Sequence, residues 1–265
     1  MAVNTALGTI MRRLRFLNVT IIFILLLIGV AGCTSQESEL VTFPDKNLDA
    51  AIRDALGKSL DEEILSTELA QLENLSIRDK NVHDLTGLEY CVNLTHLDLC
   101  GNQISDISPI SSLTKLYTLA ITESPISDIS PLSTLNNLTS LDLAGNQISN
   151  ISPLRSLSNL TILCLQGNEI SDITVLSDLS NLVDLRLTQN HVEDISALVE
   201  NAGLGEQESV LLGGNNLELY EGSKDMENIK TLEARGVIVS LDPQQWAPEK
   251  TPPGAPVPIP QPIPQ

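Results

Sequence analysis

The chain has 265 residues, a formal net charge of −19 at pH 7 and only 3% aromatic residues. This acidic excess argues against nucleic acid as a partner, because phosphates are bound by Lys and Arg side chains. It also opposes adsorption to anionic lipid headgroups, so attachment to a membrane would need something other than basic residues.

The N-terminal segment has the three parts of an export signal. Residues 11–15 are mostly basic, residues 19–30 are an apolar run, and this run ends in Val-Ala-Gly-Cys at Cys33. Such an order is typical of a secretory signal. The last four residues resemble the lipobox of bacterial lipoproteins, which implies that residues 1–32 are removed and that Cys33 carries a lipid. An uncleaved anchor is the alternative, although the run is short for a membrane span.

A short polar tether at residues 33–40 is expected to lead into a helical N-terminal cap at residues 41–74. Leu48 and Ile52 recur at helical spacing, and Gly57 is expected to end this helix. A second short helix is predicted near residues 67–72. The ends of a repeat array need a polar cover, so these helices should close the first coil.

Five tandem units follow with a fixed 22-residue period. They begin at Leu94, Leu116, Leu138, Leu160 and Leu182. Each carries Leu-x-x-Leu-x-Leu-x-x-Asn-x-Ile or a variant of it, and the Leu-x-Leu core alternates as a half-buried strand does. One unit cannot bury its own leucines, whereas stacked units share a continuous core. The period therefore predicts an α/β repeat solenoid, with its strands in one parallel sheet, over residues 75–217.

Two further columns run through these units. The first is an asparagine column expected to satisfy backbone groups where each strand turns, because an amide both donates and accepts. Its members are Asn102, Asn146, Asn168 and Asn190. Ser124 takes this place in the unit at Leu116, and we expect the missing rung to cost about 1 kcal/mol. The second column is proline, at Pro109, Pro131 and Pro153. It forbids long helices, so the convex side should consist of 3₁₀ or irregular turns.

The period breaks after Gly203, and residues 218–242 are predicted to form a C-terminal cap. Its helix should begin at Ser223 and be followed by a strand at residues 237–239. Residues 243–265 are rich in proline and cannot form helices or sheet ladders. We expect a disordered tail or spacer there, with a ligand for a Pro-recognising partner as the alternative.

The repeat is similar to that of the leucine-rich-repeat family, in its 22-residue, bacterial, internalin-like class. The resemblance extends over about residues 40–242 when the caps are included. It implies a curved array with a parallel concave sheet, a 3₁₀ or irregular convex side, a helical N-terminal cap and a C-terminal cap. It also implies protein binding and not catalysis.

The concave face is expected to consist of the residues that alternate with the core positions of the strands. Rigid concave sheets of solenoids are binding surfaces, so this face is where a protein ligand should bind. The candidate partner-binding residues are Arg78, His96, Asp98, Ala120, Asp142, Ile162, Asp184 and Arg186. The alternative is a solvated face without a ligand, on a structural spacer or adhesion element of the envelope.

Catalysis is not expected on this face. His96 and Cys100 share a strand with Asp98, but positions four apart on a strand are roughly 13 Å apart, too far for a Cys–His nucleophile pair. No histidine has neighbours at zinc-site spacing, so no cofactor is expected. A column of aspartates could hold Ca²⁺ or, more simply, satisfy the backbone of its own turns. Its members are Asp84, Asp106, Asp128, Asp172 and Asp194.

The remaining cysteines are not expected to form a disulfide. Cys100 and Cys164 are three coils apart, about 14 Å at the usual strand spacing, which is beyond the reach of a disulfide. Taken together, the sequence predicts a monomer in the bacterial cell envelope, lipid-anchored and facing outside the cytoplasm. Its membrane contact would be the N-terminal lipid, and its partner would be a protein bound non-covalently.

Overall fold

The computed structural model describes residues 38–242. The predicted signal at residues 1–32, the lipidation site Cys33 and the Pro-rich tail at residues 243–265 lie outside the described residues. Within residues 38–242, no helix combines the length and the apolar character that crossing a membrane requires.

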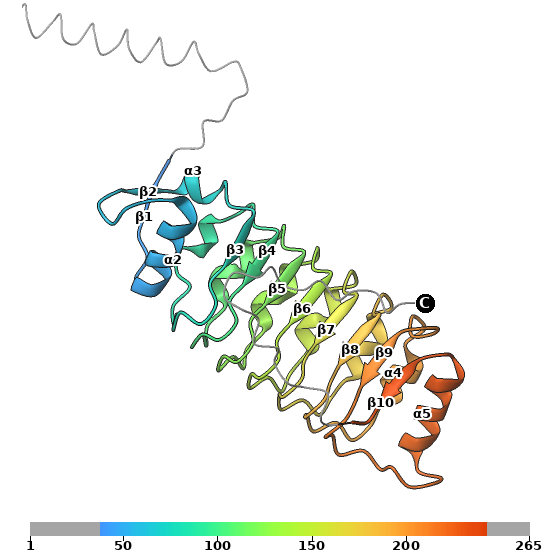
Figure 1. The fold of residues 1–265 in the computed structure, drawn as a ribbon. Coiled ribbons are helices and arrows are strands. Elements are labelled where there is room, and N and C mark those ends of the chain that lie inside the picture. The colour runs from blue at the N-terminus through green and yellow to red at the C-terminus, as the bar shows by residue number, and fades with distance from the viewer. Residues whose placement is uncertain (1–37, 243–265) are drawn as a thin grey trace, which may run out of the picture. The chain divides into compact units, whose positions relative to one another are not determined.

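Eight short strands form one parallel sheet in which spatial order follows chain order (Figure 1). The strands are β3 (Asn74–Ser76), β4 (His96–Asp98), β5 (Thr118–Ala120), β6 (Ser140–Asp142), β7 (Ile162–Cys164), β8 (Asp184–Arg186), β9 (Ser209–Leu211) and β10 (Ile238–Ser240). The register places Leu97 beside Leu119 and Leu119 beside Leu141, so that the leucines of successive coils stack directly. The predicted α/β repeat solenoid with a parallel concave sheet is therefore confirmed.

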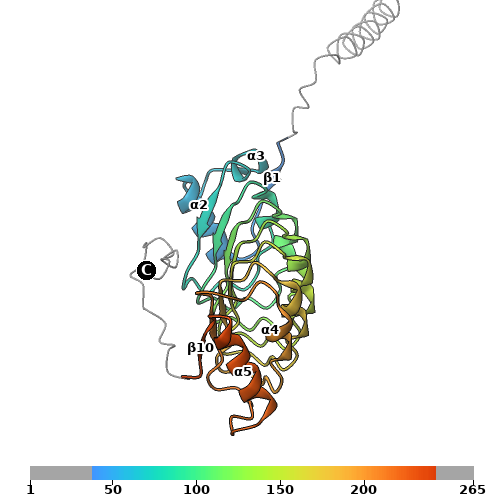
Figure 2. The same ribbon diagram turned by 90° about the vertical axis from the view of Figure 1, so that its right-hand side faces the viewer.

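The opposite side of each coil is a short helical turn, as Figure 2 shows in a view that separates the strands from the turns. The turns are the 3₁₀ helices η1 (Leu88–Tyr90), η2 (Ser108–Ser112), η3 (Ser130–Thr134), η4 (Ser152–Ser156) and η5 (Thr174–Asp178), and the α-helix α4 (Ser196–Glu200). Proline lies in the first turn of η2, η3 and η4. The helix η5 has no proline and is still a 3₁₀ helix. We infer that the short span between the two bends of a coil also favours the 3₁₀ conformation.

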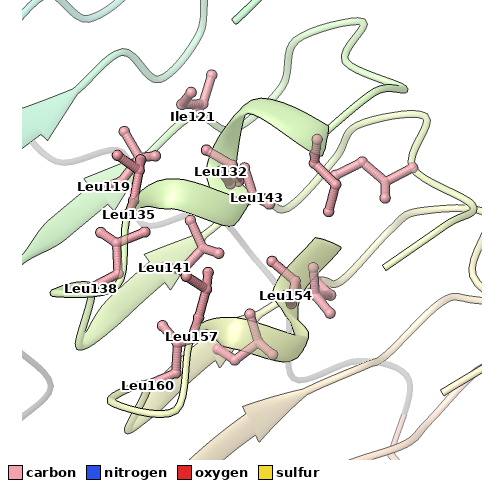
Figure 3. Close-up of a cluster of buried hydrophobic side chains, with 14 of the residues drawn as sticks. Leu119, Ile121, Leu132, Leu135, Leu138, Leu141, Leu143, Leu154, Leu157 and Leu160 are labelled. Atoms are coloured by element: carbon pink, nitrogen blue, oxygen red, sulfur yellow. The ribbon is translucent and has the colours of Figure 1, made fainter. Parts of the chain in front are cut away.

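The core is a stack of leucine and isoleucine side chains between the sheet and these turns. Figure 3 shows Leu141 of β6 between Leu119, Leu135 and Leu138 on one side and Leu157 on the other. All of these side chains are fully buried. Burying one leucine side chain contributes roughly 2 kcal/mol, so the repeated ladder is the main source of stability.

The N-terminal cap combines helices with a pair of short antiparallel strands that the sequence did not predict. Its elements are β1 (Leu40–Val41), α2 (Lys46–Leu56), β2 (Ile64–Leu65) and α3 (Ser66–Leu69), and β1 pairs with β2 in antiparallel register. Asp45 begins α2, since its side chain accepts from the Asn47 N–H at 2.8 Å and from the Leu48 N–H at 3.1 Å. Its other oxygen accepts from the His83 N–H at 2.7 Å, which joins the cap to the first coil.

The C-terminal cap is the helix α5 (Lys224–Ala234) followed by β10. Ser223 begins the helix, because its hydroxyl accepts from the Met226 N–H at 3.3 Å. The coil before this cap is longer than the regular repeats, and Gly203 makes that possible. A Cβ atom at Gly203 would lie 1.7 Å from the carbonyl oxygen of Ser180, so only glycine fits there without a shift of the backbone.

Candidate protein-binding face

The bend after each strand supports the face, and an asparagine amide there joins each coil to the one before it. The Nδ2 group of Asn146 donates to the carbonyl oxygens of Ile121 and Leu143 at 2.8 and 2.9 Å. Its Oδ1 atom accepts from the Ile126 N–H at 3.3 Å. The same pattern recurs at Asn102, Asn168 and Asn190, and at Asn215 in the next coil. We call these five residues the inner amide ladder.

Ser124 occupies the gap in the inner amide ladder. Its buried hydroxyl donates to the carbonyl oxygen of Asn102 at 3.1 Å, so this coil keeps one side-chain hydrogen bond to its predecessor. The preceding residue, Glu123, has a φ of 54°, where the next coil has Gly145. A residue with a Cβ atom has a steric cost in this left-handed conformation, but Gln189 adopts it at the same place in its own coil with a φ of 58°, so the missing asparagine is what sets the Ser124 coil apart.

A second set of asparagines lies at the bend that leads into the strands. No structural role was predicted for them from the sequence. Their Nδ2 groups donate to carbonyl oxygens of the preceding coil at 2.6–2.8 Å. They are Asn93, Asn137, Asn159 and Asn181, here called the outer amide ladder. The spacing of these asparagines equals that of the inner amide ladder, and this regularity could have predicted a second structural role.

The aspartate column hydrogen-bonds the backbone of its own turns. Asp106 accepts from the Ser108 N–H at 2.8 Å, and Asn150 accepts from the Ser152 N–H at 3.0 Å in the same position. Asp84, Asp128, Asp172 and Asp194 make the equivalent bond. Within residues 38–242, no three His, Cys, Asp or Glu side chains are grouped so that they could hold a metal ion. The column thus has the structural role, which was one of its two predicted roles.

The concave side presents the eight candidate residues with very different exposure. His96 is exposed, and the side chains of Arg78, Asp142, Ile162, Asp184 and Arg186 are partly buried. Asp98 and Ala120 expose only 4% and 5% of their surface. These two residues therefore offer a partner little contact area. Asp98 contributes to the face by fixing the position of Arg78 through an ion pair.

Two ion pairs fix both arginines of the face before any partner is present. Arg78 reaches Asp98 on the neighbouring strand at 2.8 Å, and Arg186 reaches Asp184 of its own strand at 2.7 Å. The hydrogen bonds that Arg186 donates to Asp184 raise the pKa of Arg186, so this guanidinium stays charged. The Ser209 hydroxyl also lies 3.2 Å from Asp184, which holds this carboxylate from a second strand.

Asp142 differs from these paired carboxylates. Its side chain accepts from the Ala144 N–H at 3.0 Å and interacts with the thiol of Cys164 on β7. Burial raises the pKa of Asp142, because a carboxylate loses hydration there and the groups around it do not make up for the loss. The face therefore contains one carboxylate whose charge is poorly compensated.

The cysteines of the described residues are poor candidates for a nucleophile. Cys91, Cys100 and Cys164 are free and buried. Burial raises the pKa of the Cys100 thiol to about 12, so the reactive thiolate form is suppressed at neutral pH. The Nδ1 atom of His96 lies 2.9 Å from the Thr95 hydroxyl, a group of the adjacent bend.

Gln166 is a polar residue of the face that the sequence analysis did not single out. It alternates with the core leucine Leu165 and exposes only 3% of its surface. Its Nε2 group is buried without a hydrogen-bond acceptor among the described residues. The period of the repeat places Gln166 on the concave side, but its burial could not be predicted because it depends on the neighbouring coils.

The fold and this face define a class of protein: a curved repeat solenoid with a rigid, parallel concave sheet. Comparison with family models agrees, since the model described as Leucine Rich repeats (2 copies) matches residues 92–134, 118–156, 136–178 and 158–200. Comparison with the curated proteins gave no match.

Solved structures place the chain more closely. Internalin C2 from Listeria monocytogenes is 31% identical, with a TM-score of 0.57, over 76% of this chain and 94% of that one. A leucine-rich-repeat protein of Leptospira interrogans is 22% identical, with a TM-score of 0.56, over 65% of this chain and 44% of that one, and it shares the fold. The chain belongs to the leucine-rich-repeat family and is similar to the internalins.

Proposed function

We propose that this protein is exported, anchored by a lipid at Cys33 and devoted to non-covalent recognition of a protein ligand through its concave face. Leucine-rich-repeat proteins of the internalin type mediate protein–protein interaction and are typically not enzymes, which supports this assignment. The basic and apolar N-terminal segment ending in Val-Ala-Gly-Cys supports export and anchoring.

The observation that carries the proposal is the preorganisation of the concave face. Its strands are hydrogen-bonded along the whole sheet, and both of its arginines are held by ion pairs. A partner that binds such a surface orders few side chains, so little binding energy is lost to conformational entropy. A spacer without a ligand has no need of charged groups that are fixed on a sheet.

A site-specific cross-linking experiment tests the recognition surface. A photoreactive amino acid would replace His96 or Thr118 on the concave side of the full-length protein in its own cells. The matched controls carry it at Ser112 and Ser156, exposed residues of η2 and η4 on the other side of the coils. We expect a defined cross-linked product from the concave positions only. Equal products from both sides, or none from the concave side, would favour the spacer.

The lipid anchor is tested separately. Labelled fatty acid should be incorporated into the wild-type chain and not into Cys33→Ser, and only the wild type should sediment with membranes. A Cys100→Ser variant is the matched control, since it also removes a cysteine but lies within the repeats. Label retained in Cys33→Ser would contradict the predicted anchor.

A further inference from the structure

The middle of the concave face has a carboxylate without an ion pair, Asp142, between two completed ion pairs. Register aligns Asp142 of β6, Cys164 of β7 and Arg186 of β8 in one row across the sheet. Earlier in the sheet the same row contains Asp98 of β4 and Ala120 of β5. The side chains on either side of Asp142, Ala120 and Cys164, supply no positive charge that could pair with it.

Neither arginine of the face forms an ion pair with Asp142, and the more distant charge of Arg186 lowers its pKa by less than burial raises it. The strands β3–β8 and the residues directly after them present three aspartates and two arginines on this side. Arg78 is paired with Asp98, and Arg186 is paired with Asp184. Among residues 38–242, none of the ion pairs includes Asp142. The net charge of this part of the face is therefore negative, and the unmatched carboxylate is Asp142.

A second unmet group lies next to this carboxylate. Gln166 follows Cys164 by two residues and so lies on the same side of the sheet, one strand away from Asp142. Its buried Nε2 group has no acceptor among the described residues. A buried donor without an acceptor is unfavourable in the free protein, so a partner whose acceptor draws the Gln166 side chain outward removes this penalty.

We infer that β6–β8 bind a protein segment whose Lys or Arg side chain pairs with Asp142 and whose main-chain carbonyl accepts a hydrogen bond from Gln166. A carboxylate recognises a cation, and an amide N–H recognises a carbonyl oxygen, so the two unmet groups together fit a basic peptide segment. An acidic segment would instead be repelled by the like charges of Asp98, Asp142 and Asp184. This inference rests on the proposed function and names the chemistry of the ligand.

The chain itself offers a matched control for charge. Asp142→Asn removes the charge and keeps an oxygen for the Ala144 N–H. Asp128→Asn removes one charge from a turn on the other side of the coil, where Asn150 already performs the same role in the next coil. Any effect of overall acidity must appear equally in both variants, whereas recognition at Asp142 affects only the first.

The test is a titration of the isotope-labelled full chain in detergent micelles, followed by NMR. The probes are four peptides, Gly-Ser-Gly-X-Gly-Ser-Gly, in which X is Lys, Arg, Ser or Glu. We expect the Lys and Arg peptides to shift the Gln166 side-chain amide signal saturably, with the Ser and Glu peptides binding at least tenfold more weakly. Asp142→Asn should weaken the Lys peptide at least tenfold and Asp128→Asn by less than twofold. Equal binding of the Lys and Ser peptides, or an unaffected Asp142→Asn, would overturn the inference.

A cross-linking arm separates this inference from the proposed function. If Thr118 forms its cross-linked product equally well in wild type and Asp142→Asn, recognition by the concave face stands and the role of Asp142 is wrong. If the concave positions give no product in any variant, the proposed function fails whatever the peptides do. Loss of the product in Asp142→Asn alone supports both.

Discussion

At the bend after each strand the same side chain makes the same hydrogen bonds in coil after coil, whereas on the concave face the side chain changes with almost every coil. The inner amide ladder repeats asparagine with one exception. The first column of the face reads His96, Thr118, Ser140, Ile162 and Asp184. Both regions lie on the same strands and share the same backbone register.

The difference separates two kinds of requirement within one chain. A group that satisfies the backbone of its coil must recur at the period of the repeat, because every coil presents the same unpaired groups. A side chain that contacts a partner has no reason to recur, since the partner presents a different surface to each coil. Under the proposed function, the residues of the bends serve stability and the residues of the face serve recognition, and this contrast can be tested at single residues.

The largest effect is expected from Asn146→Ala in the inner amide ladder. This change leaves the carbonyl oxygens of Ile121 and Leu143 and the N–H of Ile126 without their side-chain partner in a buried bend. We expect a loss of about 3 kcal/mol in the free energy of unfolding, measured by urea denaturation followed by circular dichroism.

Asn137→Ala in the outer amide ladder is the matched control. Asn137 donates one bond, to the carbonyl oxygen of Thr114 at 2.8 Å, at a bend that water can reach. The expected loss is about 1 kcal/mol or less. Equal losses at the two bends would show that stacking of the leucines, and not the buried amide, holds successive coils together.

The repeated half of this comparison could be predicted from sequence, because its causes are local and periodic. Leucines at a constant spacing predict the ladder in Figure 3, and asparagine in the turn predicts a backbone partner. The pairing of Leu40 with Leu65 could not be predicted, since two-residue strands carry no alternation and their contact depends on how α2 folds between them. Leu40 was accordingly assigned to the tether.

The properties of the face were less predictable for a related reason. Alternation correctly placed Asp98 and Ala120 opposite the core, yet it said nothing of their burial, which depends on neighbouring strands and on where Arg78 extends. The buried amide of Gln166 has the same origin. The identity of the side chains on the face was thus available from the sequence, but their accessibility and charge compensation required the packed structure.

An intermediate effect, of opposite sign, is expected for Asp142→Asn. If Asp142 serves recognition, its charge is a burden on the free protein, and asparagine should increase the free energy of unfolding at pH 7 by on the order of 1 kcal/mol. Burial raises the pKa of Asp142 in the folded state. The penalty is therefore fully present above that pKa and is relieved as the pH falls through it towards the unfolded value, where the carboxyl is protonated.

Urea denaturation of wild type and Asp142→Asn between pH 7 and pH 3.5 measures this burden. The difference between the two proteins should shrink as the pH is lowered. A wild type that is more stable than the variant at pH 7 would mean that Asp142 contributes to folding, as the residues of the bends do, and would remove the contrast between the two regions at this position.

The smallest effect is expected for Asp194→Asn, in the aspartate column of the bends. The hydrogen bond from Lys224 at 2.8 Å, together with those from Ser196, lowers the pKa of Asp194 to about 2. This contribution to stability is present above the unfolded pKa and is lost as the pH falls towards 2. Asparagine keeps the bond from the Ser196 N–H, as Asn150 does in its own turn, and the lost ion pair is exposed and screened. We therefore expect the free energy of unfolding to fall by a few tenths of a kcal/mol at pH 7, and this loss should disappear as the pH is lowered to 2. A loss that persists at pH 2 would mean that the carboxylate has a structural role in its turn that an amide cannot supply.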